Sequence, residues 1–202
     1  MYQASLKKIS YRESLQGFTV IELMVTIAIV VLVTGLIMIQ YSSFNNSVLL
    51  RNQAYLTAFD MREAQSLAVS VKGQGTQFRE EYGLYFALSS PSSYILFQDN
   101  AVNGDKYPAQ YNVGENIGVP YRVDPRFVIK DICATNALSR TCYSTDPTLS
   151  TLAVSFRRPD FEASFYSPSK LNINSAEIIF GTPTGTTKRS VIIYKTGQVS
   201  VD

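Results

Sequence analysis

The sequence has 202 residues, of which 46% are hydrophobic and 17% charged, and this suits one folded domain with an appendage. It contains no histidine and only two cysteines, Cys133 and Cys142. A Ser-His-Asp or Cys-His catalytic site, an imidazole metal site and a four-thiolate zinc site are therefore excluded. The carboxylates are scattered without a paired arrangement, so we expect no enzyme activity, no cofactor and no metal.

The formal net charge of +2 comes from the first 17 residues, which hold Lys7, Lys8 and Arg12 against Glu13. The rest of the chain has as many basic as acidic side chains. A neutral body gives no global reason to bind nucleic acid.

Residues 18–39 form an apolar segment whose only charge is Glu22. As a helix it is about 33 Å long, enough for a hydrocarbon core of roughly 30 Å. Basic residues precede it, so we expect the N-terminus in the cytoplasm and everything after Gln40 outside. A secretory signal is cut after its apolar stretch at small residues, and this segment has no such ending.

A carboxylate inside this segment needs an explanation. A lone acidic residue costs about 2.5–3.5 kcal/mol near the bilayer centre and less near an interface. One interpretation is that Glu22 lies close enough to the headgroups to be tolerated.

The residues around Glu22 indicate a second interpretation. The junction reads Gly17-Phe18-Thr19-Val20-Ile21-Glu22-Leu23-Met24-Val25. It resembles the cleavage motif of type IV prepilins and type II secretion pseudopilins, which is a basic leader ending in Gly, then Phe, then Glu as the fifth mature residue, then an apolar helix. The resemblance implies that a prepilin peptidase cuts between Gly17 and Phe18 and methylates the new amine of Phe18. It also implies that Glu22 is the carboxylate used in filament assembly.

The physical chemistry is compatible with that implication. Cleavage leaves a positive amine on Phe18, and in a filament core this amine and a neighbour's Glu22 can pair in dry surroundings. Each charge is strongly disfavoured alone, so pairing fixes the register between subunits. The implied partners are other pilin or pseudopilin subunits, the prepilin peptidase and the inner-membrane assembly platform.

A second helical pattern follows the apolar segment. Residues 48–71 contain no Pro or Gly, and apolar side chains recur so as to predict one buried helix face, at Leu49, Leu56, Phe59, Ala64, Leu67, Ala68 and Val71. Lys72 and Gly73 end the pattern as a basic last turn and a glycine cap. We therefore predict a cleaved leader (1–17), a membrane and filament-core helix (18–40), its amphipathic continuation (41–72) and a β-domain (73–202).

The remaining sequence predicts strands separated by Pro, Gly, Asn and Ser. The expected strands are 82–88, 94–97, 127–132, 152–156, 161–165, 177–180, 191–194 and 199–201. Gly197-Gln198 suggests a terminal hairpin, and residues 99–125 suggest a long loop with one edge strand. The expected fold class is α+β, with the long helix packed against an antiparallel β-domain.

Three stretches point to one branch of the resembling family. Residues 62–68, 154–163 and 190–200 together resemble GspH/FimT-type minor pseudopilins. The resemblance implies a body of two β-sheets on the long helix and a minor subunit near a filament tip. It leaves open whether the machine is a type II secretion system, a type IV pilus or a competence pilus.

Cys133 and Cys142 bracket a short polar loop. Outside the cytoplasm such a pair favours a disulfide, which by the chain-entropy estimate stabilises the fold by roughly 2–3 kcal/mol. Two free thiols are the alternative.

Two basic stretches are candidates for anion or DNA binding. Arg157-Arg158-Pro159-Asp160 is most simply a hairpin turn. Lys188 and Arg189 follow a Gly/Thr-rich stretch and can form a small basic tip, although they depart from the Gly-Arg-x-Arg motif with which some relatives contact DNA. A minor pilin that binds DNA during natural transformation is therefore the alternative function, and the neutral body argues against it.

Overall fold

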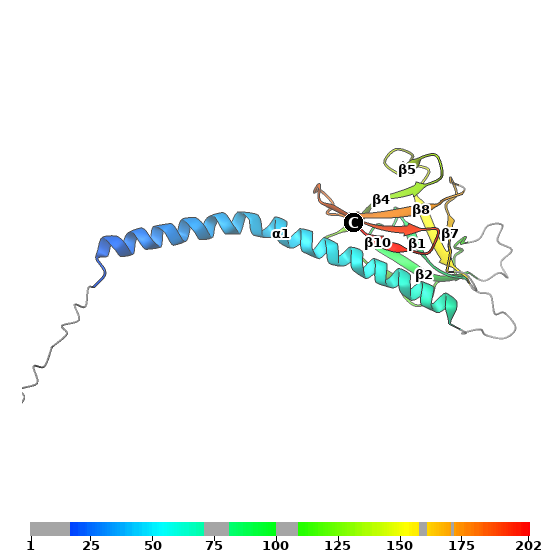
Figure 1. Cartoon of the computed structure of the whole chain (residues 1–202), viewed down its shortest axis with the longest axis horizontal. Coiled ribbons are helices and arrows are strands. Elements are labelled where there is room, and N and C mark those ends of the chain that lie inside the picture. The colour runs from blue at the N-terminus through cyan, green and yellow to red at the C-terminus, as the bar shows by residue number, and fades with distance from the viewer. Residues whose placement is uncertain (1–16, 71–80, 100–108, 158–160, 171) are drawn as a thin grey trace, which may run out of the picture. The chain divides into compact units, whose positions relative to one another are not determined.

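The computed structural model describes residues 17–70, 81–99, 109–157, 161–170 and 172–202 (Figure 1). Within these ranges it has one long helix, α1 (Val20–Val69), and two antiparallel sheets of five strands each. The α+β prediction is therefore confirmed. Contacts divide the chain into two compact units, Met1–Phe44 and Asn45–Asp202, which are described separately.

The first sheet has the strand order β3-β2-β1-β6-β7 and the second the order β10-β9-β8-β4-β5. The strands of the first sheet are β1 (Glu81–Ala87), β2 (Ser93–Asp99), β3 (Tyr121–Arg122), β6 (Thr151–Phe156) and β7 (Ala163–Tyr166). Those of the second are β4 (Val128–Thr135), β5 (Arg140–Cys142), β8 (Ser175–Gly181), β9 (Lys188–Tyr194) and β10 (Val199–Val201).

The described part of the first unit is the apolar beginning of α1. Val20–Met38 has a mean hydropathy of 2.7, and all its side chains are exposed. Its two threonines bond within the helix, since the hydroxyl of Thr26 donates to the carbonyl of Leu23 (2.9 Å) and that of Thr34 to the carbonyl of Val30 (2.6 Å). These polar groups therefore need no water, as a lipid environment requires. Length and composition suit a membrane span or a signal anchor.

In the second unit, the later part of α1 buries one face in the core. The buried side chains of this face are mostly small and recur every three or four residues: Leu50, Ala54, Ala58, Met61, Ala64 and Ala68. The prediction of the buried face was partly wrong, because Leu56 and Phe59 are 58% and 65% exposed. Alanine lets a helix approach a sheet closely, whereas Leu56 and Phe59 point outward.

Every predicted strand has a counterpart in the sheets, and the predicted edge strand in the 99–125 region is β3. The terminal hairpin is also confirmed, since Gly197 has a φ of +82° between β9 and β10. A Cβ atom at this glycine would lie 2.0 Å from the carbonyl oxygen of Phe161, so only glycine fits the turn. The sequence missed β5, because its three residues lie in the segment predicted as a polar loop.

One core connects α1 with both sheets. Its largest buried side chains come from central strands of both, with Phe86 on β1, Phe156 on β6 and Phe180 on β8 all at most 1% exposed. The Gln65 side chain of α1 also donates to the carbonyl of Gly197 at 2.6 Å. The helix is thus held by apolar burial and by a polar contact to the terminal hairpin.

Some predictions fall outside the described residues. These are the leader up to Gln16, the helix end at Lys72 and Gly73, and the turn at residues 158–160.

Candidate functional site

The predicted processing junction lies just before α1. Gly17 and Phe18 are exposed, Phe18 at 78%, and nothing lies near the Gly17 α-carbon on the side where a Cβ would project. The peptide bond between them is therefore accessible to a peptidase. The helix begins three residues after Gly17, so the bond precedes regular structure.

Glu22 sits in the first turn of α1, where it has a local role at the start of the helix. The backbone N–H of Glu22 donates to the hydroxyl of Thr19 at 3.3 Å. Thr19 is thus the N-cap residue, and Thr19-Val20-Ile21-Glu22 has the spacing of a capping box. A carboxylate here also lies favourably at the positive end of the helix dipole. Helix capping is therefore a local role for Glu22 that is separate from the predicted role in filament assembly.

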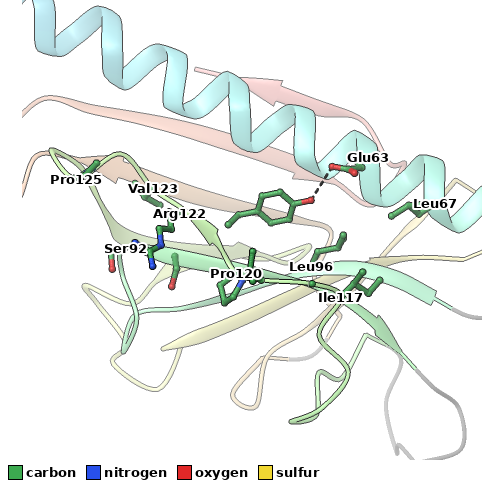
Figure 2. Close-up of a pocket in the computed structure, with 13 residues that line it drawn as sticks. Glu63, Leu67, Ser92, Leu96, Ile117, Pro120, Arg122, Val123 and Pro125 are labelled. Atoms are coloured by element: carbon green, nitrogen blue, oxygen red, sulfur yellow. Dashed lines mark hydrogen bonds between the residues drawn. The ribbon is translucent and has the colours of Figure 1, made fainter.

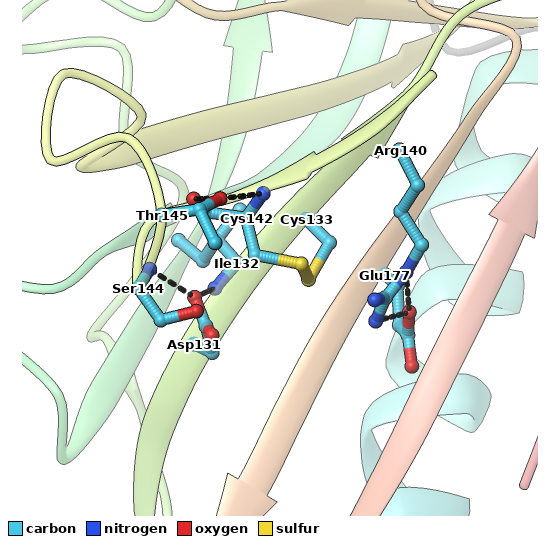
Figure 3. Close-up of polar contacts among 8 residues, drawn as sticks. All are labelled: Asp131, Ile132, Cys133, Arg140, Cys142, Ser144, Thr145 and Glu177. Carbon is cyan, nitrogen blue, oxygen red and sulfur yellow. Dashed lines mark hydrogen bonds and ion pairs between the residues drawn. A yellow bond between two sulfur atoms is a disulfide. The ribbon is translucent and has the colours of Figure 1, made fainter.

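Cys133 and Cys142 form a disulfide that joins β4 to β5 (Figure 3). The two residues are directly opposite each other in the antiparallel ladder. The predicted disulfide is thus supported, although the bridged segment is a β-hairpin rather than a plain loop. Oxidised cysteines persist outside the reducing cytoplasm, which agrees with a body exposed on the outer side.

Asp131 lies beside this disulfide, and its ligand atom is within 4.8 Å of both sulfur atoms. Such a trio suggests a metal site, yet disulfide sulfurs are not thiolates and are poor ligands. The carboxylate of Asp131 is also occupied, since one of its oxygens accepts the N–H groups of Ile132 (2.9 Å) and Ser144 (3.2 Å) (Figure 3). Asp131 therefore anchors the hairpin to the following loop.

Two tyrosine–carboxylate hydrogen bonds fasten the first sheet to α1. The hydroxyl of Tyr94 on β2 donates to Asp60, and that of Tyr121 on β3 donates to Glu63 at 3.1 Å. The two rings stack with their centroids 5.5 Å apart. Asp60 and Glu63 are three residues apart on the helix, so the pair of bonds spans one turn.

Burial changes the acidity of these groups. Burial, and then the hydrogen bond to Asp60, raise the pKa of Tyr94 well above its usual range. Burial and the hydrogen bond to Glu63 raise the pKa of Tyr121 to about 12. Burial raises the pKa of Asp60, although its bond to Tyr94 acts in the opposite direction. Both phenols therefore remain protonated donors near neutral pH.

A groove opens between α1 and the edge of the first sheet, beside these tyrosines (Figure 2). Its volume is about 1230 Å³. We call it the β3 groove, and it is lined chiefly by Leu67, Leu96, Ile117, Val119, Pro120 and Val123. Glu63 and Arg122 are the charged residues on its wall. No sequence signal indicated this groove, because its lining comes from three distant segments.

Described residues of both basic stretches lie near acidic groups. Arg157 lies 3.3 Å from the carboxylate of Glu81, which also accepts the hydroxyl of Ser155. Lys188 and Arg189 begin β9 instead of forming a loop tip. They line a hollow of about 230 Å³ together with Glu177 and Asp202, among other residues.

This mixture of charges offers a phosphate backbone little net attraction. Lys188 and Arg189 are thus near carboxylates. They belong to the second unit of the chain, whereas Gly17 and Glu22 belong to the first.

No family model, no curated protein and no solved structure matches this chain.

Proposed function

We propose that this chain is a minor pilin or pseudopilin, a structural subunit of a type II secretion pseudopilus or type IV pilus. One observation carries the proposal. An accessible Gly17–Phe18 bond precedes a capped apolar helix that has a carboxylate, Glu22, as the fifth residue after the bond. Helix capping accounts for a glutamate in the first turn of a plain signal anchor, but it does not account for a Gly-Phe bond at this spacing before that glutamate.

The proposed sequence of events follows from that segment. The chain inserts once, with its basic leader in the cytoplasm and the body outside. A prepilin peptidase cuts after Gly17 and methylates the amine of Phe18. The assembly platform then moves the helix from lipid into a filament, where Glu22 pairs with the amine of a neighbouring subunit.

The energetics explain why a carboxylate is useful in this place. In lipid, Glu22 near the interface is tolerated because water and headgroups are within reach. In a dry helix bundle the same carboxylate needs a positive partner, so only the register that supplies the amine is stable. The charge therefore selects one arrangement of subunits. Apolar contacts alone permit many arrangements of subunits, because lipid tails are as apolar as the helix.

Two substitutions at one position test the proposal against the capping role of Glu22. Glu22→Gln keeps a side chain that suits a capping box but removes the charge, and Glu22→Leu removes both. Cleavage and membrane insertion should be normal in both variants, and incorporation into sheared filaments should be lost in both. If Glu22→Gln assembled normally, the carboxylate would serve the helix start and the proposal for Glu22 would fail.

A further inference from the structure

A buried carboxylate lies beside the Cys133–Cys142 disulfide. Asp131 and Cys133 are two residues apart on β4, so their side chains project from the same face of the sheet. A carboxylate oxygen of Asp131 and the two sulfur atoms all lie within 4.8 Å of one another. Asp131 is only 7% exposed. Burying a carboxylate is costly, so its position next to two sulfur atoms needs an explanation.

The hydrogen bonds of Asp131 explain its orientation but use only one of its oxygens. Oδ1 accepts the N–H groups of Ile132 and Ser144, at 2.9 and 3.2 Å (Figure 3). Among the described residues, no hydrogen bond reaches the other oxygen, Oδ2. The two N–H groups therefore hold the carboxylate in place near the sulfur atoms, while Oδ2 is available to take a proton.

The two cysteines differ in how easily a second molecule can reach them. Cys142 lies on β5, the edge strand of the second sheet, whereas Cys133 lies on β4 between β5 and β8. Cys142 is 8% exposed and Cys133 is 0% exposed. A molecule that exchanges disulfides with the reduced chain therefore meets Cys142 first, and Cys133 reacts from the interior.

The chemistry of exchange demands different help for the two cysteines. The thiolate is the form that attacks a disulfide, and burial in apolar surroundings disfavours it. Cys142 at the sheet edge can lose its proton to water, whereas the buried Cys133 needs an acceptor inside the protein. Asp131 is within reach, directly or through one water molecule. Glu177 lies opposite Cys133 on β8, but its carboxylate is paired with Arg140, at 3.0 and 2.6 Å (Figure 3).

We propose that Asp131 is the proton acceptor through which the Cys133–Cys142 disulfide closes, with Cys142 as the first cysteine to react. The oxidant is a disulfide outside the chain, carried by a thiol oxidoreductase. The Cys142 thiolate attacks one sulfur of that disulfide, which releases a thiolate and leaves a mixed disulfide on Cys142.

Cys133 then gives its proton to Asp131 and attacks the sulfur of Cys142, and the oxidant leaves as its second thiolate. Two protein thiols are thereby oxidised, one disulfide is reduced, and the two protons end on the two released thiolates. The reaction involves neither the Gly17–Phe18 bond nor Glu22, and it goes beyond the proposed function.

Oxidation of the reduced full-length chain by oxidised glutathione, in mild detergent, tests the role of Asp131. Acid quenching and mass spectrometry separate the dithiol, the glutathione adduct and the closed disulfide. Asp131→Asn keeps an oxygen for the two N–H groups but cannot take the proton. It should leave adduct formation unchanged and slow closure by about 100-fold. Glu177→Gln is the matched control, because it removes the other nearby carboxylate, and both of its rates should be unchanged.

The two steps distinguish proton transfer from a structural role. If Asp131 served only to anchor the hairpin, its loss would loosen the strands around both cysteines and change adduct formation as well as closure. Normal closure in Asp131→Asn, or equal slowing in Asp131→Asn and Glu177→Gln, would overturn the role of Asp131.

Two single-cysteine variants test the order of reaction. Cys133→Ser leaves Cys142, which should form the glutathione adduct as fast as the unmodified chain does. Cys142→Ser leaves the buried Cys133, which should react about tenfold more slowly. Equal rates for the two cysteines would overturn the assigned order. The Glu22 variants test the proposed function separately, so the two failures are distinguishable.

Discussion

Two parts of α1 place similar side chains in opposite surroundings. In the first unit, Val20–Met38 leaves every large aliphatic side chain exposed and has a mean hydropathy of 2.7. In the second unit, the same helix buries Leu50 and Met61 completely against two sheets. The first part requires an apolar solvent or partner from outside the chain, whereas the two sheets of the same chain cover the buried face of the second part. The helix is therefore one element of secondary structure that depends on two sources of stability.

The largest expected effect is on the free energy of unfolding of the second unit, where buried and exposed positions of α1 can be compared. Met61→Asp places a carboxylate in the core and should lower the free energy of unfolding by about 4 kcal/mol or more. Phe59→Asp, two residues earlier on the exposed face, should cost less than about 1 kcal/mol. Urea unfolding of the full chain in mild detergent, followed by tyrosine fluorescence, measures both. Similar losses in the two variants would contradict the assignment of the buried face.

The next effect concerns the part of α1 that lacks an internal partner. Val30→Arg puts a charge near the middle of the apolar segment and should raise the apparent free energy of membrane insertion by about 2.5–3.5 kcal/mol. Val48→Arg, on the same helix but within the second unit, should leave insertion unchanged. Carbonate extraction of membranes carrying each variant measures the inserted fraction. An equal response would mean that the apolar segment does not enter the membrane.

A smaller effect concerns two aspartates of the body, Asp124 and Asp60, whose contributions to stability should depend on pH in opposite ways. Hydrogen bonds from Arg126 lower the pKa of Asp124 to about 2, so Asp124 stabilises the fold above its unfolded-state pKa of about 4 and loses this contribution as pH falls toward 2. Burial raises the pKa of Asp60, so the folded state binds its proton more tightly than the unfolded chain does. The contribution of Asp60 to stability is therefore largest at low pH and declines as pH rises through its raised pKa.

Substitution by asparagine makes this difference measurable. Asp124→Asn should destabilise the fold by about 1 kcal/mol at neutral pH and by less near pH 2. Asp60→Asn keeps an oxygen that can accept the Tyr94 hydroxyl, and its effect on stability should become less unfavourable as pH rises, opposite to that of Asp124→Asn. Thermal unfolding of both variants across pH 2–7 measures how the stability change of each depends on pH. If the two stability changes varied with pH in the same direction, the opposite pKa shifts of Asp124 and Asp60 would be contradicted.

The smallest expected effect concerns the basic residues at the start of β9. Because Glu177 and Asp202 share their hollow, Lys188→Ala with Arg189→Ala should not change DNA affinity. Titration of labelled DNA at several salt concentrations measures the DNA affinity. No salt-sensitive binding is expected for the unmodified chain or for the double variant. A clear salt slope that falls in the double variant would instead favour the alternative function in DNA uptake.

Sequence patterns predicted the elements of this protein because these depend on local chemistry. An unbroken apolar run predicts a helix of membrane length, and alternating aromatic and β-branched residues between turn residues predict strands. The α+β class, the position of the terminal hairpin at Gly197 and the presence of an edge strand before Pro125 were all foreseeable. The junction at Gly17 and Phe18 and the position of Glu22 are likewise properties of the sequence.

Tertiary structure decided which side chains meet. Leu56 and Phe59 match a buried helical pattern, yet the small residues Ala54, Ala58 and Ala64 face the sheets, because close packing there favours small side chains. The bonds from Tyr94 and Tyr121 to α1 and the β3 groove join segments far apart in sequence, so no local pattern predicts them. The short β5 forms where Cys142 lies opposite Cys133. A polar strand of three residues has no recognisable sequence pattern of its own, so only its pairing with β4 defines it.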